Sequence, residues 1–275
     1  MKLLIVCFIF SCQIVFSQKY LPLSDELKEI SGLQFLNDTL LVAHNDGGNS
    51  PTLFLINNKG QILKKVLVMN AKNHDWEDVT CNATHLFIGD IGNNNNKRQN
   101  LQILRIEIES LLKKDSVFAE KMFVEYEDQK AFPPENAEKN FDAECLIYAE
   151  GHLWIFTKNY TTPFDGLTKI YKFTFEAEKK LVLPVFATLK TGKNGWMKDA
   201  ITGGEYAFGH FYLLTYDRVL KVEKVGNQFT ILREKRLPQY KQSEAISVFQ
   251  TNKILIGNEH QKYLGKQKLL QFSFE

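Results

Sequence analysis

Acidic residues recur at two fixed positions in five short segments of the chain. The segments each end on an apolar residue, and they are Glu29–Leu33, Asp75–Val79, Asp142–Leu146, Lys198–Ile201 and Ser243–Ile246. The position two residues before that apolar residue holds, in chain order, Ser31, Glu77, Glu144, Asp199 and Glu244. Two residues earlier still, the chain has Glu29, Asp75, Asp142, Met197 and Gln242. Carboxylates therefore fill most of two aligned positions, and such clustering carries a cost in repulsion unless something compensates it.

A bound hard cation is the first compensation that these residue types indicate. Ca²⁺ takes roughly 6–8 oxygen ligands, many of them from carboxylates. Two alternatives need no metal: pairing with basic side chains such as Lys158 and Arg98, and hydrogen bonding to backbone amides where the repeats meet. The predicted metal ligands are Glu29, Asp75, Glu77, Asp90, Asp142, Glu144, Asp199 and Glu244.

A pair of these carboxylates is also a candidate for acid–base catalysis. Glu77 or Glu144 would act as general base on a metal-bound water or a sugar ring, with Asp90 or Asp199 as its partner. The sequence contains no G-x-S-x-G and no H-E-x-x-H motif, so nothing indicates a serine nucleophile or a zinc-protease site.

Two loops rich in glycine and asparagine follow the first two acidic segments. They are His44–Ser50 and Gly89–Arg98, and each carries an acid inside the run. Such loops offer backbone amides and amide oxygens, so we expect a ligand-binding rim, with ordinary tight turns as the alternative. The spacing fits neither an EF-hand nor a phosphate loop. The predicted ligand-binding residues are His44, Asn45, Asp46, Asn93, Arg98, Lys158, Asn159 and Asn258.

The elements that position these residues follow from a diverged repeat. Each acidic segment precedes two or three further apolar runs, which gives four strands in four units and three in the last. The fourth strand of the third unit is expected over 181–187. The segment 19–24 precedes the first unit and can supply the missing outer strand, where Pro22 is tolerated. This pattern predicts an all-β fold: a five-bladed β-propeller whose N-terminal strand closes the last blade. A six-bladed ring, with one blade near 107–140, is the alternative.

In a propeller the first strand of each blade lines the central channel. Side chains at i and i+2 share a face of a strand, so both aligned positions point the same way. The repeat therefore predicts that the carboxylates converge on one end of the channel. The tryptophans Trp76, Trp154 and Trp196 are interpreted as packing between blades, with sugar stacking as the alternative.

The ends and the cysteines bear on localisation. Residues 1–17 combine Lys2, an apolar run and a small-residue site at Ser17, which predicts a signal peptide and a single mature domain over 18–275. A lipoprotein anchored through Cys12 is the minor alternative. We expect export to the periplasm or the exterior and no transmembrane helix. Cys81 and Cys145 remain in the mature chain, either as a disulfide or as two buried thiols.

Composition limits the partners. Lysine and arginine number 34 and acids 32, for a formal net charge of +2, which argues against a nucleic-acid binder. The expected partner is a small molecule, a glycan or a protein, and the chain is expected to be a monomer.

The repeated segment starts resemble the SdiA-regulated propeller family, whose first strands read E-[IL]-S-G-L and x-E-G-[IV]. The strings DWED (75–78) and GDIGNN (89–94) also look like a group of exported bacterial propellers with no assigned reaction. The resemblance implies a five-bladed propeller with a metal in its channel. A more distant resemblance to lactonase and phytase-like propellers implies a Ca²⁺-dependent hydrolase. In that case a metal would lie among Glu77, Asn45 or Asn258, and Asp90 or Asp199.

These observations favour an exported binding or scaffold propeller with Ca²⁺ at an acidic channel mouth. The first alternative is a metal-dependent hydrolase of the lactonase, phosphoesterase or glycosidase type, which uses the channel carboxylates. The second is a module that binds a protein partner.

Overall fold

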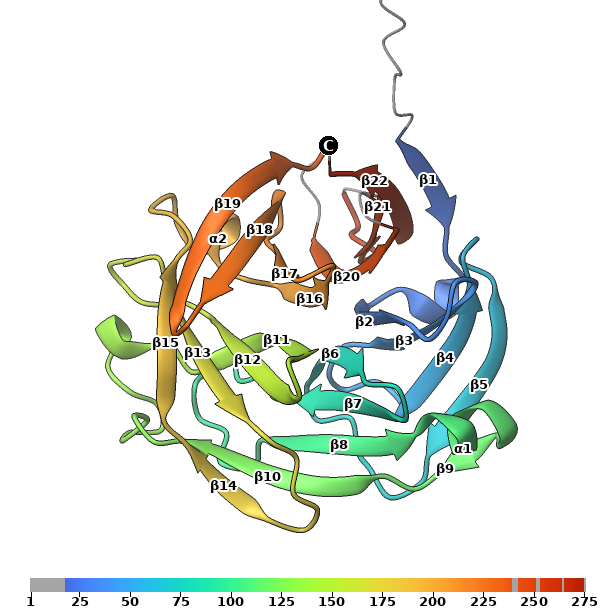
Figure 1. The fold of residues 1–275 in the computed structure, drawn as a ribbon, viewed down its shortest axis with the longest axis horizontal. Coiled ribbons are helices and arrows are strands. Elements are labelled where there is room, and N and C mark those ends of the chain that lie inside the picture. The colour runs from blue at the N-terminus through green and yellow to red at the C-terminus, as the bar shows by residue number, and fades with distance from the viewer. Residues whose placement is uncertain (1–17, 239–241, 251–252, 264, 275) are drawn as a thin grey trace, which may run out of the picture.

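The chain folds into a ring of five β-sheets about a central axis (Figure 1). The computed structural model describes residues 18–238, 242–250, 253–263 and 265–274, so the expected signal segment with Cys12 lies outside the described residues. Among the described residues, no helix has the length and apolar character needed to span a bilayer. The predicted five-bladed β-propeller is confirmed.

Each blade is an antiparallel sheet of four strands that runs from the channel outward. Blade 1 comprises β2 (Ile30–Phe35), β3 (Leu40–Asn45), β4 (Thr52–Asn57) and β5 (Ile62–Val68). Blade 2 comprises β6 (Trp76–Cys81), β7 (His85–Asp90), β8 (Gln102–Glu107) and β10 (Glu120–Tyr126). Blade 3 comprises β11 (Asp142–Ala149), β12 (His152–Lys158), β13 (Leu167–Phe173) and β15 (Val185–Lys190). Blade 4 comprises β16 (Gly203–Ala207), β17 (His210–Leu214), β18 (Arg218–Val225) and β19 (Gln228–Arg236).

Blade 5 joins the two ends of the described chain. Its inner strands are β20 (Ser243–Phe249), β21 (Lys253–Asn258) and β22 (Lys268–Ser273), and its outer strand is β1 (Lys19–Pro22). β1 pairs antiparallel with β22, from Lys19 opposite Gln271 to Pro22 opposite Lys268. Because β1 is an edge strand, the missing amide of Pro22 breaks no inner ladder. The predicted closure by the N-terminal segment is confirmed.

The outer rim departs from the expected four strands at two places. The apolar run 181–187 was expected to be one strand of blade 3, but it divides at Pro184, whose nitrogen carries no hydrogen to continue a ladder. β14 (Lys180–Leu183) instead pairs parallel with β10 of blade 2, while β15 completes blade 3. A short strand, β9 (Ser116–Val117), pairs parallel with β5 of blade 1.

The stretch 107–140 holds no sixth blade. It contains helix α1 (Ile108–Lys113), β9, β10 and the 3-10 turn η2 (Asn136–Glu138). The six-bladed alternative is therefore wrong, because β9 and β10 extend blades 1 and 2 rather than forming a sheet of their own.

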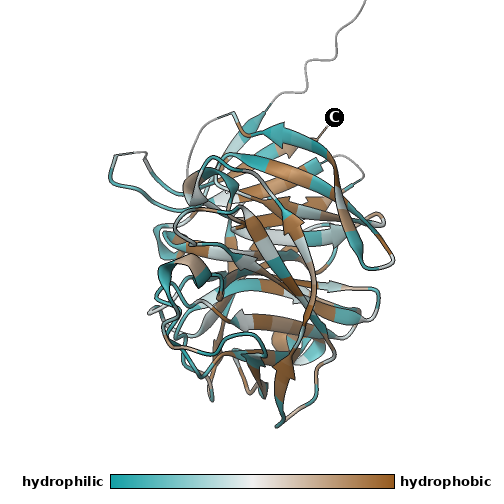
Figure 2. Ribbon diagram, turned by 90° about the vertical axis from the view of Figure 1, so that its left-hand side faces the viewer, coloured by the Kyte–Doolittle hydropathy of each residue, from teal (hydrophilic) through white to brown (hydrophobic). Residues whose placement is uncertain are grey.

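The hydrophobic core lies between blades rather than in one centre. Side chains alternate along β3, so Leu41 and Ala43 pack toward blade 5, while Val42 packs toward blade 2. The same alternation gives five clusters, one at each junction of consecutive blades. Figure 2 shows hydrophobic residues along the strands and mainly hydrophilic connecting loops.

Side chains on the inner strands also connect neighbouring blades. Asp78 on β6 accepts the backbone amide of Leu146 in blade 3 at 2.9 Å. Thr202 donates to the carbonyl of Ser243 in blade 5 at 2.7 Å, and Ser247 accepts the amide of Phe35 in blade 1 at 3.1 Å. Buried backbone groups at the channel are thus hydrogen-bonded across the junctions, as such groups must be.

Candidate functional site

The carboxylates of the first aligned position reach the channel because their strands carry β-bulges. In blades 1, 2, 3 and 5 the pairing of the first and second strands skips one residue. A bulge residue stands outside the ladder, and its side chain is turned away from the regular alternation. The skipped residues are Ser31, Glu77, Glu144 and Glu244.

The three glutamates among them line a pocket of about 430 Å³ at the end of the ring where the first strands begin. The pocket combines carboxylates with one lysine, three amides and an aromatic side. Its lining is Asp46, Glu77, Asn94, Glu144, Lys158, Tyr160, Trp196, Met197, Tyr216, Gln242, Glu244 and Gln261. The sequence predicted that Asp46, Glu77, Glu144, Lys158 and Glu244 would belong to the site, and the structure brings them together.

Blade 4 does not contribute the predicted carboxylate. Its first strand, β16, begins at Gly203, so Asp199 lies before it, in the helical turn α2 (Trp196–Asp199). The placement of Asp199 on the first strand is therefore wrong. Its buried carboxylate accepts a hydrogen bond from Arg218 at 2.6 Å, which fixes α2 against blade 4. α2 instead presents Trp196 and Met197 to the pocket.

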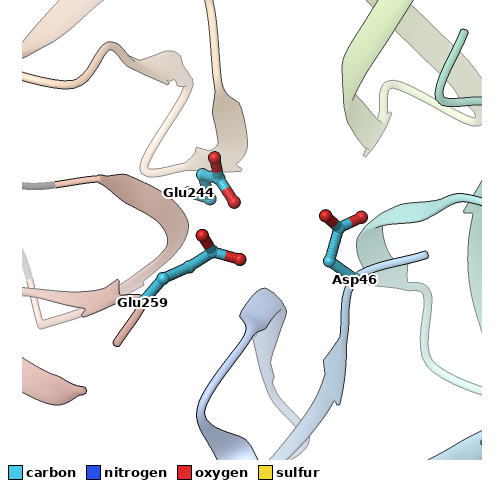
Figure 3. A group of neighbouring side chains, drawn as sticks. All are labelled: Asp46, Glu244 and Glu259. Atoms are coloured by element: carbon cyan, nitrogen blue, oxygen red, sulfur yellow. The ribbon is translucent and has the colours of Figure 1, made fainter. Parts of the chain in front are cut away.

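Three carboxylates from two blades form a tight cluster at the edge of the pocket. Asp46 follows β3, Glu244 lies on β20 and Glu259 follows β21. One oxygen of each lies within 4.8 Å of the others, and Figure 3 shows all three carboxylates facing a common space. A second cluster of the same tightness shares Asp46 and adds Asp75 and Glu77.

Glycines allow the two Gly/Asn-rich loops to approach the second cluster. A Cβ at Gly92 would lie 1.9 Å from Oε1 of Glu77, and a Cβ at Gly47 would lie 2.3 Å from Oδ1 of Asp75. A side chain at either position would therefore displace a carboxylate. The composition of the loops follows from this close packing, and Asp46 and Asn94 are their contributions to the pocket lining.

Burial and mutual repulsion change the protonation of the cluster. Burial raises the pKa of Asp46 to about 7, and the Glu244 carboxylate adds to the increase. Burial, followed by Glu244 and Asp46, raises the pKa of Glu259 to about 10. Burial also raises the pKa of Glu77, to which Asp46 contributes. A cation among these groups would favour their ionised forms and would offset their mutual repulsion.

One buried lysine supplies a positive charge beside these carboxylates. Lys158, 3% exposed, contacts Glu144 and donates to the hydroxyl of Tyr216 at 2.8 Å. Tyr216 in turn donates to Glu244 at 3.2 Å. Burial by itself would lower the pKa of Lys158, but Glu144 and the surrounding oxygens raise it well above the usual value. Glu144 is thus paired internally, and the charge of Lys158 also opposes the increase in the pKa of Asp46.

The remaining predicted residues lie around the pocket rather than in its lining. Asp90 is fully buried and is held by Arg98 at 2.8 Å and Gln102 at 2.8 Å. Asn93 donates its amide to Asp142 at 2.5 Å. Glu29 accepts a hydrogen bond from Asn49. The side-chain amides of Asn45, Asn159 and Asn258 donate to the carbonyl of Glu26, to Asp165 and to Ser243, respectively.

His44 is buried in blade 1 rather than exposed at the rim. Its ring lies over Gly32, where a Cβ would come within 2.1 Å of Nε2, and contacts Trp76 edge-on at 5.6 Å. Burial lowers the pKa of His44 to about 4, so the imidazole is neutral at pH 7.

Several pocket residues were not predicted. Tyr160 and Tyr216 lie two residues after β12 and β17, Gln261 lies three residues after β21, and Glu259 of the carboxylate cluster follows β21 directly. Their common signal is position: in blades 3, 4 and 5, residues shortly after the second strand reach the site. Trp196 has no such signal, because α2 interrupts the repeat. Trp76 and Trp154 are fully buried, as predicted for packing residues, whereas Trp196 is 39% exposed.

The two cysteines are free thiols in the structure. Burial raises the pKa of Cys81 to about 12 and that of Cys145 well above its usual value. Of the two interpretations that the sequence left open, the structure agrees with free thiols, of which Cys145 is buried and Cys81 half-buried.

Glu205 provides a pH-dependent contribution to stability. It lies on β16, accepts from Gln34 at 2.9 Å and from the amide of Val248, and has Asp78 as a nearby acid. Burial raises its pKa from 4.5 to about 7. The folded state therefore keeps a proton that the unfolded chain releases, and stability falls as pH rises from about 4.5 through 7.

Replacing Glu205 with glutamine should remove this dependence. The unfolding free energy of Glu205→Gln minus that of the wild type should increase by about 2.5 kcal/mol between pH 5 and pH 8. Urea unfolding at a series of pH values measures the difference. A difference that stays constant with pH would show that Glu205 is already ionised in the folded protein at pH 5.

No family model matches the chain, and no curated protein matches it in sequence. Among solved structures, a glutaminyl cyclase from Myxococcus xanthus is similar, with a TM-score of 0.51 and 11% identity over 92% of this chain and 94% of that one. A virginiamycin B lyase from Staphylococcus aureus gives a TM-score of 0.44 at 10% identity over 94% and 74% of the two chains. Likeness at this identity shows the fold alone and gives no sequence-level support to the SdiA-regulated resemblance.

Proposed function

We propose that this propeller is a binding module that holds a divalent cation, Ca²⁺, at its acidic channel mouth. One observation carries the proposal: oxygens of Asp46, Glu244 and Glu259 lie within 4.8 Å of one another. An ion with ligands at about 2.4 Å can be shared by oxygens up to twice that distance apart.

The surroundings of the cluster support a cation of this kind. All its ligand atoms are carboxylate oxygens, which Ca²⁺ prefers, and no histidine or cysteine belongs to either described cluster. Glu244 and Glu259 are 5% and 8% exposed, so water screens their repulsion poorly. Three carboxylates leave part of a coordination sphere of about 6–8 oxygens for other ligands.

Asp46 belongs to both clusters and is the informative position to change. Adding Ca²⁺ should raise the melting temperature of the wild type in proportion to the logarithm of its concentration. Asp46→Asn should lose this increase. Without Ca²⁺ the variant should be at least as stable as the wild type, because one repelling carboxylate is gone. Differential scanning fluorimetry, with metal analysis of the purified protein, measures both effects.

Asp38→Asn is the matched control, because Asp38 is exposed in the turn between β2 and β3, outside both clusters. It should respond to Ca²⁺ as the wild type does. A wild-type protein that contains no divalent ion and does not respond to Ca²⁺ would contradict the proposal.

Hydrolysis is the second candidate, favoured by the place of Glu77. This residue lines the pocket and belongs to the second cluster with Asp46 and Asp75, where it would act as general base beside the cation. Export from Gln18 onward and affiliation with the SdiA-regulated propellers also belong to this proposal. They rest on the signal-peptide pattern and on the first-strand motifs.

A further inference from the structure

The pocket has a second wall that a metal ion alone does not use. Trp196 from α2 and Tyr160 from the loop after β12 lie with their ring centroids 5.1 Å apart on the side formed by blades 3 and 4. Trp196 is 39% exposed and its neighbour Met197 is 50% exposed. Large apolar side chains exposed at the rim of a polar pocket indicate contact with a ligand.

Three primary amides complete the lining between the aromatic and acidic walls. Gln261 donates to Gln242, which donates to Glu244 at 2.9 Å. The amide oxygen of Asn94 accepts a hydrogen bond from the hydroxyl of Tyr160 at 3.3 Å. Amides both donate and accept, so they match hydroxyl groups.

A buried acceptor also lacks a partner here. Glu144 is 4% exposed and lines the pocket, and its Oε2 has no hydrogen-bond partner among the described residues. A buried acceptor without a partner costs free energy that a ligand hydroxyl would recover.

We propose that the pocket binds a saccharide, with the apolar face of one sugar ring against Trp196 and its hydroxyls on the amides and on the bound cation. The inference rests on the proposed function, because the ion supplies part of the binding site. A volume of about 430 Å³ suits one or two sugar rings. Vicinal hydroxyl oxygens would take coordination positions that Asp46, Glu244 and Glu259 leave open.

An organic ammonium ion is the competing ligand, since acids and aromatic rings also attract cations. It would use the carboxylates that hold the metal and would leave the three amides without a role. The two ligands therefore differ in their response to Ca²⁺: the saccharide requires the ion, whereas the ammonium ion competes with it.

The experiment uses the chain from Gln18 on a glycan microarray, with Ca²⁺ and with EDTA. The wild type should bind a subset of glycans in Ca²⁺ and lose them in EDTA. Trp196→Ala should keep the thermal response to Ca²⁺ but lose at least tenfold in saccharide affinity, while Trp196→Phe keeps part of it. Phe208→Ala, an exposed aromatic in the turn between β16 and β17, is the control and should bind as the wild type.

Fluorescence gives a second measurement, because Trp76 and Trp154 are fully buried and Trp196 is exposed. A glycan identified on the array should protect Trp196 from iodide quenching. A response to Ca²⁺ without glycan binding would overturn this inference and leave the proposed function standing. The absence of a Ca²⁺ response would overturn the proposed function. Binding of choline that Ca²⁺ displaces, or glycan binding that EDTA leaves unchanged, would overturn the ion-dependent saccharide site.

Discussion

Replacing Lys158 with methionine is expected to lower the unfolding free energy by about 3–5 kcal/mol, because it leaves a buried carboxylate without its counter-charge. The side chains of Lys158 and Glu144 are 3% and 5% exposed, so water cannot take over the lost interaction. The hydroxyl of Tyr216 loses a donor as well. Urea unfolding of the wild type and Lys158→Met at neutral pH measures the effect.

A double substitution separates the lost charge from the lost packing. Glu144→Leu combined with Lys158→Met removes both charges and should recover at least half of the loss, since an apolar pair replaces a buried ion pair at little cost. Lys113→Met is the surface control. Its pair with Glu109 has side chains 69% and 76% exposed and should contribute less than about 0.5 kcal/mol. A double variant no more stable than Lys158→Met would assign the loss to packing.

Removing the closing strand is expected to have the largest effect of all. A chain that begins at Ser24 lacks β1, and with it the pairing to β22 and the buried side chains of Leu21 and Leu23. Net hydrogen-bond contributions near 1 kcal/mol each, together with two buried leucines, amount to about 5–8 kcal/mol. That is comparable with the whole stability of an ordinary domain, roughly 5–15 kcal/mol.

The chain that begins at Gln18 is the reference for this truncation. Circular dichroism melting should show a cooperative transition for the reference and a large decrease in melting temperature, or no folded protein, for the shorter chain. A synthetic peptide covering residues 18–24 should restore part of the stability when it is added in excess. Equal melting temperatures for the two chains would contradict a closing role for β1.

Most of the fold could be predicted from the sequence repeat. Apolar runs predict strands where both faces of a strand are buried against neighbouring blades, as in β3, whose alternate residues pack toward blades 5 and 2. The prediction of one strand over 181–187 was wrong because Pro184 lacks an amide hydrogen, a feature that hydrophobic periodicity does not reveal. The pairing of β14 with β10 then depends on tertiary geometry.

The site was predictable where the bulges repeat and not elsewhere. Glu77, Glu144 and Glu244 follow from aligning the segments, because each occupies the same bulge. Asp199 matched the pattern by composition only, since Gly203 and not Ala200 begins the strand of blade 4. Trp196 lies on an insertion that has no counterpart in the other blades.

The bulges place the glutamates of the channel at positions that take no part in the strand pairing of the ring. A bulge residue takes no part in strand pairing and belongs to none of the five hydrophobic clusters, so its identity depends on the polar groups around it. In blade 1, Ser31 occupies the bulge where blades 2, 3 and 5 have glutamate, and its hydroxyl donates to the carbonyl of Glu77. Natural variation or design at a handful of bulge positions can therefore change what the channel binds while the scaffold stays the same. The five sheets thus form a constant scaffold, and the glutamates at the bulges make the mouth of this channel acidic.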